Sequence, residues 1–361
     1  MRIVIAGGGT GGHLFPGIAI AEEFLKRDEK NKVVFIGTKK GIESRLLDKF
    51  GYELKIIDVE GVKGRGVKAL IKGAYQIPKS LWQSVRILKQ FGPDIVFGVG
   101  GYASGPAVLA AYFMNISTAI AEQNATPGVT NRILGNFVDK IFVTYAQTQK
   151  CFSQKKVVLS GNPVRASFAV EQVQTKEKKD YRQLLVFGGS QGAAAINKSV
   201  VGMLPQLQSM KGKVRILHQT GMQQMEEVKK SYQQSGMEAV VTDFIIDMSD
   251  AYAQSDLIVC RAGATSLAEI TAAGKAAVLI PYPWAANDHQ LKNALAMSNA
   301  GAAVVITEKE LSGEKLFGVI DNILRDEAKL RRLEENSAKL GKVEAAATIV
   351  DNCIKLVAEK N

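Results

Sequence analysis

Short apolar runs alternate with helical patterns along the chain, and this alternation constrains the fold more than any other feature. Most runs are apolar throughout, which is typical of parallel strands that helices cover on both faces. The order strand–helix–strand predicts right-handed βαβ units, and therefore an α/β fold with doubly wound sheets. The runs are RIVIA, KVVFIG, ELKIID, DIVFGVG, TAIAEQ, KIFVTY and KVVLSG, then QLLVF, VRILHQ, AVVTDF, LIVCRAG, AAVLIPYP and AAVVIT.

Length and a change of composition predict two domains. A chain of 361 residues is too long for one modest core. The polar stretch VRASFAVEQVQTKEKKDYRQ, near residues 165–182, separates the two series of strands. We expect Rossmann-like domains over residues 1–165 and 166–340, facing each other across a cleft. A last helical segment over residues 341–361 could pack back on the first domain.

Composition excludes several other classes of protein. With 46% hydrophobic and 22% charged residues, the chain is an ordinary globular sequence. Glycines interrupt the first apolar stretch too early for a signal peptide, and no run reaches the ~20 apolar residues of a membrane-spanning helix. Cys151, Cys260 and Cys353 lack metal-ligand spacing, which favours reduced thiols in a cytosolic protein.

Two glycine-rich loops each follow a predicted strand and precede a predicted helix. They are GGGTGGH at residues 7–13 and GGSQG at residues 188–192. Glycines allow close approach of the backbone, and a helix N-terminus offers free N–H groups to an anion. The second loop is not a P-loop, since no Gly-Lys-Ser/Thr follows it. The first could be a dinucleotide fingerprint, but the second strand ends in IGTKK without the acid expected on NAD, so only NADP stays open.

Polar residues also follow most of the other predicted strands. Ligands of open α/β sheets bind at the carboxyl ends of strands. All three histidines, His13, His218 and His289, lie in such segments, which favours a cleft lined by strand ends. The segments are GVGGYASGP at 98–106, EQN at 122–124, GNPVR at 161–165, HQTG at 218–221, RAGATSLAE at 261–269 and NDHQ at 287–290.

A basic stretch indicates an anionic partner. Residues 61–90 hold seven Lys or Arg and no acid, in a chain of net charge +11. Apolar residues ringed by cations suit an anionic bilayer, at about 1 kcal/mol per basic residue. The alternative is an amphipathic helix whose apolar side is core. Nucleic acid is disfavoured because no binding motif accompanies the charge. The predicted membrane face is Lys68, Ile71, Lys72, Tyr75, Lys79 and Trp82.

These motifs, in this order and spacing from Ile3 to about Val305, resemble the MurG family of bacterial glycosyltransferases. The motifs are GGGTGGHLFPGIAIAEEF, GVGGYASGP, EQNATPGVTNR, SGNPVR, FGGSQGA, HQTG, RAGATSLAEI and NDHQLKNA. The resemblance implies a GT-B fold whose C-terminal domain holds most of the donor. It also implies inverting transfer of GlcNAc from UDP-GlcNAc to the MurNAc 4-hydroxyl of undecaprenyl-diphosphate-MurNAc-pentapeptide (lipid I). The product would be lipid II of peptidoglycan synthesis.

The resemblance also implies roles for individual residues. Ser190 and the Gly189–Gly192 amides would cradle the donor diphosphate, Glu269 would hold the ribose hydroxyls, and the backbone of Ile245 would recognise uracil. Gln290, with His289, would contact GlcNAc. Further donor contacts are Thr10, Gly11, Gly12, Asn124, Arg165, Gln191, Ala264, Thr265, Ser266, Leu267 and Ala268, and the acceptor side holds Gly9, Tyr102 and Ser104. Many family members carry Arg where this chain has Ala194, so that contact is absent or made elsewhere.

Inverting transfer needs a base for the acceptor hydroxyl and stabilisation of the leaving UDP. His13 is the candidate catalytic base, since an unperturbed imidazole has a pKa near 6.5. Alternatively, His13 only positions the loop or a diphosphate. No Asp-X-Asp triplet is present, so we expect no obligatory metal or other cofactor, with UDP-GlcNAc as donor substrate.

The expected partners are UDP-GlcNAc, lipid I, an anionic membrane surface and other cell-wall synthesis proteins, without nucleic acid. The expected location is the cytoplasmic side of the cell membrane, with peripheral attachment. Three alternatives stay open: another GT-B enzyme such as a UDP-GlcNAc 2-epimerase, an NADP-dependent oxidoreductase, and a non-catalytic sensor of nucleotide sugars.

Overall fold

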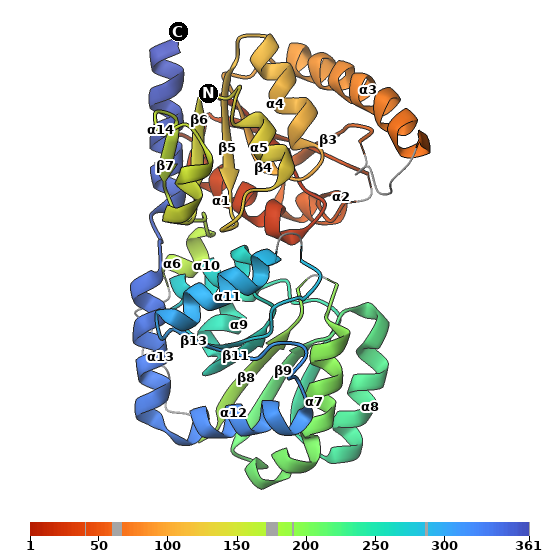
Figure 1. The fold of residues 1–361 in the computed structure, drawn as a ribbon, viewed down its shortest axis with the longest axis vertical. Helices are drawn as coiled ribbons and strands as arrows, with labels where there is room; N and C mark the ends of the chain where they lie inside the picture. Colours follow the sequence, from red (N-terminus) through yellow and green to blue (C-terminus); the bar gives the residue numbers. More distant parts are fainter. Residues whose placement is uncertain (40, 60–66, 171–179, 190, 286–287, 361) are drawn as a thin grey trace. The chain divides into compact units, whose positions relative to one another are not determined.

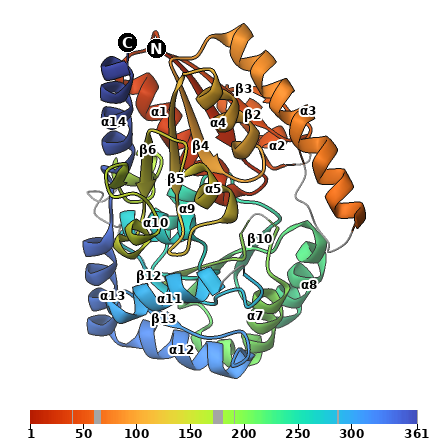
Figure 2. The same ribbon diagram turned by 45° about the horizontal axis from the view of Figure 1, so that its top comes forward.

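The chain forms two compact units, each built on a parallel sheet with helices on both faces (Figures 1 and 2). The computed structural model describes residues 1–39, 41–59, 67–170, 180–189, 191–285 and 288–360. Unit 1 comprises Met1–Ala166 and Lys342–Asn361, and unit 2 comprises Ser167–Gly341. Every one of the apolar runs named above contains a strand of one of the two sheets.

Unit 1 is built on a seven-stranded sheet of order β3-β2-β1-β4-β5-β6-β7. The chain winds outward from β1 in one direction and then from β4 in the other, so the ends of β1 and β4 meet at the switch point where doubly wound sheets bind ligands. Its strands are β1 Arg2–Gly7, β2 Lys32–Gly37, β3 Glu53–Ile56, β4 Ile95–Gly100, β5 Ser117–Glu122, β6 Lys140–Val143 and β7 Val157–Leu159. Its helices are α1 Gly11–Arg27, α2 Glu43–Leu46, α3 Val67–Phe91, α4 Ser104–Phe113, α5 Val129–Leu134 and α14 Ala345–Lys360, with α6 Ala166–Val170 at the boundary of the units.

Unit 2 repeats this plan on a six-stranded sheet of order β10-β9-β8-β11-β12-β13. Here β8 and β11 lie at the switch point. Its strands are β8 Arg182–Phe187, β9 Val214–Gln219, β10 Ala239–Thr242, β11 Leu257–Cys260, β12 Ala276–Leu279 and β13 Ala303–Val305. Its helices are α7 Ala194–Leu207, α8 Met225–Ser235, α9 Met248–Gln254, α10 Ala264–Ala272, α11 His289–Asn299, α12 Gly313–Arg325 and α13 Glu327–Leu340.

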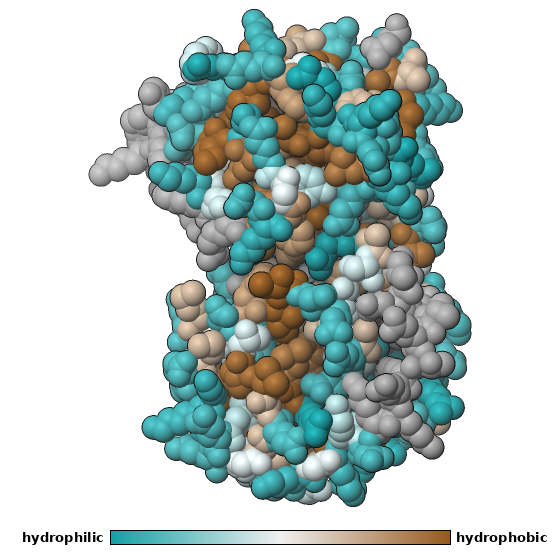
Figure 3. Space-filling view, turned by 180° about the vertical axis from the view of Figure 1, so that it is seen from behind, coloured by the Kyte–Doolittle hydropathy of each residue, from teal (hydrophilic) through white to brown (hydrophobic). Residues whose placement is uncertain are grey.

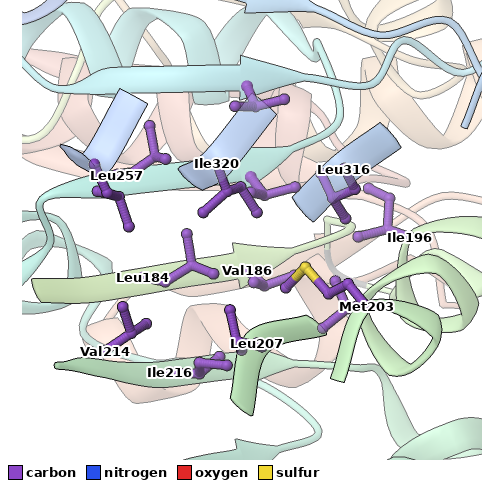
Figure 4. Close-up of a cluster of buried hydrophobic side chains, with 14 of the residues drawn as sticks. Leu184, Val186, Ile196, Met203, Leu207, Val214, Ile216, Leu257, Leu316 and Ile320 are labelled. Carbon is purple, nitrogen blue, oxygen red and sulfur yellow. The ribbon is translucent and has the colours of Figure 1, made fainter. Parts of the chain in front are cut away.

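The core of unit 2 shows why the strands are apolar throughout. Side chains of β8 and β9 meet those of α7 and α12 in one buried cluster (Figure 4). Leu184 and Val186 of β8 face this cluster, while Leu185 between them is also fully buried, on the opposite face of the sheet. Burying one such side chain stabilises the fold by roughly 1.5–3 kcal/mol. With helices on both faces, the buried part of β8 is apolar on both sides of the sheet.

Helix α14 is far in sequence from the rest of unit 1, but it packs against α1 and β5 of that unit. Ile349, Val350 and Cys353 are fully buried on its inner face. At its surface, Arg27 of α1 pairs with Asp351 at 2.9 Å. The C-terminal residues thus complete the core of the first unit rather than the second.

On the face shown in Figure 3, hydrophilic residues surround patches of exposed hydrophobic residues on each unit. Within the described residues, no helix combines the length and the hydropathy needed to cross a bilayer. All three cysteines carry free thiols; Cys151 is exposed, whereas Cys260 and Cys353 are buried.

Candidate functional site

The first glycine loop joins β1 to α1 and interlocks with the loop after β4. Gly7, Gly8 and Gly9 have φ values of +154°, +131° and +88°, a region that side chains rarely allow. A Cβ at Gly101 would lie 2.5 Å from the Gly8 carbonyl oxygen. The two loops therefore touch backbone to backbone at the carboxyl edge of the sheet. Glycine is needed at these positions for close approach as well as for the turn.

His13 lies in the first turn of α1, directly after Gly11 and Gly12. Its backbone N–H donates to the Thr10 carbonyl at 3.2 Å. Its half-buried ring rests on the backbone of Gly100, where a Cβ would lie 2.7 Å from Nδ1. The position of His13 is thus set by both loops.

The predicted acceptor residues differ in exposure. Gly9 and Tyr102 are exposed, whereas Ser104, the first residue of α4, is fully buried. A Cβ at Gly98 would collide with the Ser104 hydroxyl, so this serine packs against β4. Of these three residues, only Gly9 and Tyr102 are therefore accessible to a ligand.

Glu122, at the end of β5, organises the loop that carries Asn124. One carboxylate oxygen accepts from the N–H and the side-chain amide of Asn124, at 3.0 and 3.2 Å. The other accepts from the Gly128 N–H at 3.0 Å and from Asn131 Nδ2 at 2.8 Å. Because Glu122 is buried, its bonds fix the loop from inside, and half-buried Asn124 forms its outer side.

Arg165 is buried within unit 1. Its guanidinium lies over the rings of Phe15 and Phe50, 5.2 and 5.9 Å from their centroids. Burial raises the pKa of the nearby Glu22 carboxyl, and the charge of Arg165 opposes that rise. In this structure the arginine therefore packs against aromatic rings of α1 and of the turn before β3.

The second glycine loop, between β8 and α7, packs against the segment that follows β9. Gly189 and Gly192 have φ values of +90° and +76°, and a Cβ at Gly192 would collide with the Thr220 carbonyl. Gln191 is exposed, and Ser190 lies outside the described residues. The loop leads directly into α7, a helix of 14 residues.

Gln219 links this loop to the predicted uracil site. Its side-chain amide donates to the Gly189 carbonyl at 2.8 Å, and its Oε1 accepts from the Ile245 N–H at 3.2 Å. It is buried, and motif reasoning assigned it no role. The only sequence signal was its place in HQTG directly after a strand.

His218 corrects one expectation. It lies within β9, fully buried, and its ring nitrogens are bonded to Tyr232 Oη at 3.0 Å and Asn197 Oδ1 at 3.1 Å. Burial lowers its pKa to about 3, so the ring is neutral. The expectation that all three histidines line an opening is therefore wrong for His218. It holds Asn197, which in turn donates to the Thr220 carbonyl at 2.9 Å.

Helix α10 carries most of the remaining predicted donor residues. Glu269 is buried and accepts from the Tyr252 hydroxyl at 3.2 Å. Ser266 and Ala268 are half-buried, whereas Ala264, Thr265 and Leu267 are buried. The more accessible pair thus lies on the outer side of the helix.

Arg261, which motif reasoning did not single out, holds the segment after β12. It pairs with Glu308 at 2.6 Å and donates to the Ile280 carbonyl at 3.2 Å. Gln290, beside His289 at the start of α11, accepts from the Tyr282 N–H at 3.0 Å. The bonds to Ile280 and Tyr282 hold the segment after β12 near the carboxyl ends of β11 and β12. Among the described residues, no cluster of three His, Cys, Asp or Glu is suited to hold a metal ion.

Comparison with known proteins agrees with this geometry. Residues 3–143 match the glycosyltransferase family 28 N-terminal domain and residues 183–351 match its C-terminal domain. The UDP-N-acetylglucosamine--N-acetylmuramyl-(pentapeptide) pyrophosphoryl-undecaprenol N-acetylglucosamine transferase of Syntrophus aciditrophicus is 53% identical over 99% of both chains. The protein of the same name from Geobacter sulfurreducens is 49% identical over 98% of both.

Solved structures share the same fold. MurG of Acinetobacter baumannii matches with a TM-score of 0.75 and 31% identity, covering 98% of this chain and 99% of that one. The S. aureus MnaA–UDP structure matches with a TM-score of 0.69 at 15% identity, covering 100% of this chain and 98% of that one, which is a likeness of fold alone.

Two doubly wound sheets, each with a glycine loop at its switch point, define a GT-B glycosyltransferase of family 28. Within that class, identity near 50% over nearly the full length places the chain in one family. The chain belongs to the MurG family of N-acetylglucosamine transferases. The predicted fold class and the family resemblance are both confirmed.

Proposed function

We propose that this chain transfers GlcNAc from UDP-GlcNAc to the MurNAc 4-hydroxyl of lipid I, with inversion, to give lipid II. The main support is identity of 53% over 99% of a relative named for this transfer. Four of the strand-end loops on which the resemblance rests, those after β1, β4, β8 and β11, also lie at the switch points of the two sheets.

In this proposal unit 2 binds the donor. The N-terminus of α7 and the amides of Gly189–Gly192, with Ser190, receive the diphosphate, because a helix N-terminus favours negative charge. Glu269 accepts from the ribose hydroxyls, the backbone at Ile245 contacts uracil, and Gln290 with His289 binds GlcNAc. Gln191 and residues 264–268 line the pocket. Thr10, Gly11, Gly12, Asn124 and Arg165 contribute from unit 1.

We also propose that unit 1 binds the acceptor and the membrane. Gly9 and Tyr102 belong to the acceptor side, whereas Ser104 of the predicted set is buried and packs against β4. His13 accepts the proton of the 4-hydroxyl as its oxygen attacks C1 of GlcNAc, and the C1–O bond breaks with its electron pair leaving on UDP. The α7 N-terminus stabilises that developing charge. The proposed chemistry requires no metal and no further cofactor.

The decisive experiment is a product assay. A water-soluble lipid I analogue and UDP-GlcNAc are incubated with the protein, with and without chelator, and products are identified by mass spectrometry. We expect the disaccharide product and UDP in equal amounts in both samples. Formation of the C2 epimer of the donor sugar would instead favour the epimerase, and donor binding without turnover would favour a sensor.

The proposed location is the cytoplasmic side of an anionic membrane, with contact through α3 and neighbouring helices of unit 1. In α3, Ile77 and Trp82 are 57% and 63% exposed, and the Arg86 guanidinium lies 5.9 Å from the Trp82 ring centroid. Phe113, at the end of α4, is 70% exposed, and α4 packs on α3. The side chains of Lys68, Ile71, Lys72 and Tyr75 lie outside the described set. Other cell-wall synthesis proteins are proposed as partners from the family alone.

A further inference from the structure

The carboxylate of Glu43 lies buried against the first glycine loop. Glu43 is the first residue of α2 and only 1% exposed. One oxygen accepts from the Gly9 N–H at 2.7 Å. The other accepts from the N–H and hydroxyl of Thr38 at 2.9 and 3.0 Å. Bonds to an ionised acceptor are roughly twice as strong as neutral ones, so this side chain holds two strand-end segments together.

Three glycines leave the space that this carboxylate occupies. A Cβ at Gly37 would lie 2.7 Å from Glu43 Cγ, and Cβ atoms at Gly8 and Gly41 would collide with the carboxylate itself. These glycines come from three different segments: the loop after β1, the end of β2 and the turn before α2. Such convergence indicates a cradle formed around one side chain.

The same loop is held from its other side by the segment after β4. Gly101 packs on the Gly8 carbonyl, and the His13 ring rests on Gly100. Glu43 and Gly101 therefore enclose the backbone at Gly8 and Gly9, directly before the turn that carries His13. Movement of the loop away from Glu43 would displace the start of α1 and the imidazole with it.

The bond also changes the chemistry of the loop. The Gly9 N–H, which a phosphate loop would offer to an anion, is occupied by a buried carboxylate. We propose that Glu43 is a positioning residue: it fixes the Gly7–His13 loop for the acceptor reaction and withholds the Gly9 amide from phosphate. This inference rests on the proposed function.

The test replaces Glu43 by Gln, which keeps the shape but presents an amide N–H₂ to one of the backbone donors. We expect kcat to fall about ten- to hundredfold, since small misplacement of a catalytic group has effects of that size. The Kd for UDP-GlcNAc, measured by calorimetry, should change much less than kcat, because most of the proposed donor contacts lie in unit 2 and only those of Thr10, Gly11 and Gly12 belong to this loop. Thr38→Val, which removes one of the three bonds, should lower kcat in the same direction by less.

Asp139 provides a matched control. It accepts from the N–H and hydroxyl of Thr118, at 2.8 and 2.9 Å, as Glu43 does from Thr38, but at the amino edge of the same sheet. Asp139→Asn should therefore lower stability without lowering kcat. Wild-type kcat in Glu43→Gln, or an equal loss of kcat in Asp139→Asn, would overturn the positioning role.

Hydrogen exchange provides a readout that does not depend on activity. Peptides covering residues 7–13 should exchange faster in Glu43→Gln than in the wild type, and should be unchanged in Asp139→Asn. Unchanged exchange in Glu43→Gln would overturn the inference even if the protein proves to be a transferase. Conversely, faster exchange in a protein without transferase activity would overturn the proposed function and leave the structural role of Glu43 supported.

Discussion

Buried side chains that bond to backbone hold the proposed site from inside. Glu43 and Glu122 accept from loop N–H groups, and Gln219 joins a loop carbonyl to the Ile245 N–H. A carboxylate or amide fixed in this way sets loop geometry before substrate arrives, which is the preorganisation that catalysis needs. The residues expected to touch substrate thus depend on others that do not.

His13→Gln should separate catalysis from binding. If His13 is the base, kcat should fall about 10²- to 10⁴-fold, the usual contribution of a general base. The Kd for UDP-GlcNAc should stay nearly constant, because the proposed donor site lies mainly in unit 2. Steady-state kinetics with a lipid I analogue, together with calorimetry, measure both quantities. Turnover close to that of the wild type would show that His13 is not the base and only shapes the loop.

His218 should make stability depend on pH. Its pKa is about 3 in the fold and near 6.5 when unfolded, so the unfolded chain binds the proton first as pH falls. The stability that depends on neutral His218 is therefore fully present above about pH 6.5. As the pH falls from there to about 3, this group lowers the free energy of unfolding by roughly 1.4 kcal/mol per pH unit. Urea unfolding from about pH 7.5 to 5 should show this slope in the wild type.

In His218→Gln the slope should flatten, because the replaced side chain no longer titrates in this range. His289→Gln, a change in the first turn of α11, serves as control and should keep the slope of the wild type. Equal slopes in all three proteins would mean that His218 does not cause the acid sensitivity.

At the scale of elements, the sequence predicted the strands better than the buried side chains that hold the loops at their ends. Continuous apolar runs identify buried parallel strands, and polar residues after β1, β4, β5, β8 and β11 identify the edge where ligands bind. Glu43 and Gln219 were not predicted as site residues, because their partners lie 34 and 26–30 residues away and meet them only after folding. His218 was misplaced for a related reason: its partners, Asn197 of α7 and Tyr232 of α8, turn this polar residue at the strand end inward.

Helix α14 should be essential to unit 1. Ile349→Ala removes a fully buried side chain that packs in the interface of α14 with α1 and β5. Such deletions lower the free energy of unfolding by about 2–5 kcal/mol. Urea denaturation followed by circular dichroism measures the change. Lys355→Ala, on the exposed side of the same helix, should change it by less than about 0.5 kcal/mol; similar losses in both variants would contradict this packing.

At the scale of the whole molecule, the charge and the exposed aromatic residues of unit 1 predict how the protein meets its lipid substrate. With net charge +11, we expect binding to vesicles that contain anionic lipid at low salt, weaker binding at high salt, and little binding to neutral vesicles. Co-sedimentation measures all three. Sedimentation that ignores both lipid charge and salt would contradict the proposed attachment.

The double change Ile77→Ala and Trp82→Ala should weaken that binding by about tenfold or more, because it removes the exposed apolar area on α3. Val240→Ala, an equally exposed apolar residue in unit 2, is the matched control and should bind as the wild type does. An effect of the same size in the control would place the contact outside α3.

Unit 1 is assembled from two distant pieces of chain, with all of unit 2 lying between them in sequence. During translation, unit 2 is therefore complete before the segment that covers α1 and β5 has been made. The first domain to begin synthesis is the last to be finished. Its uncovered apolar surface is then exposed to chaperones and to aggregation for longer than that of unit 2. A premature stop before residue 342 would leave unit 2 whole but unit 1 incomplete.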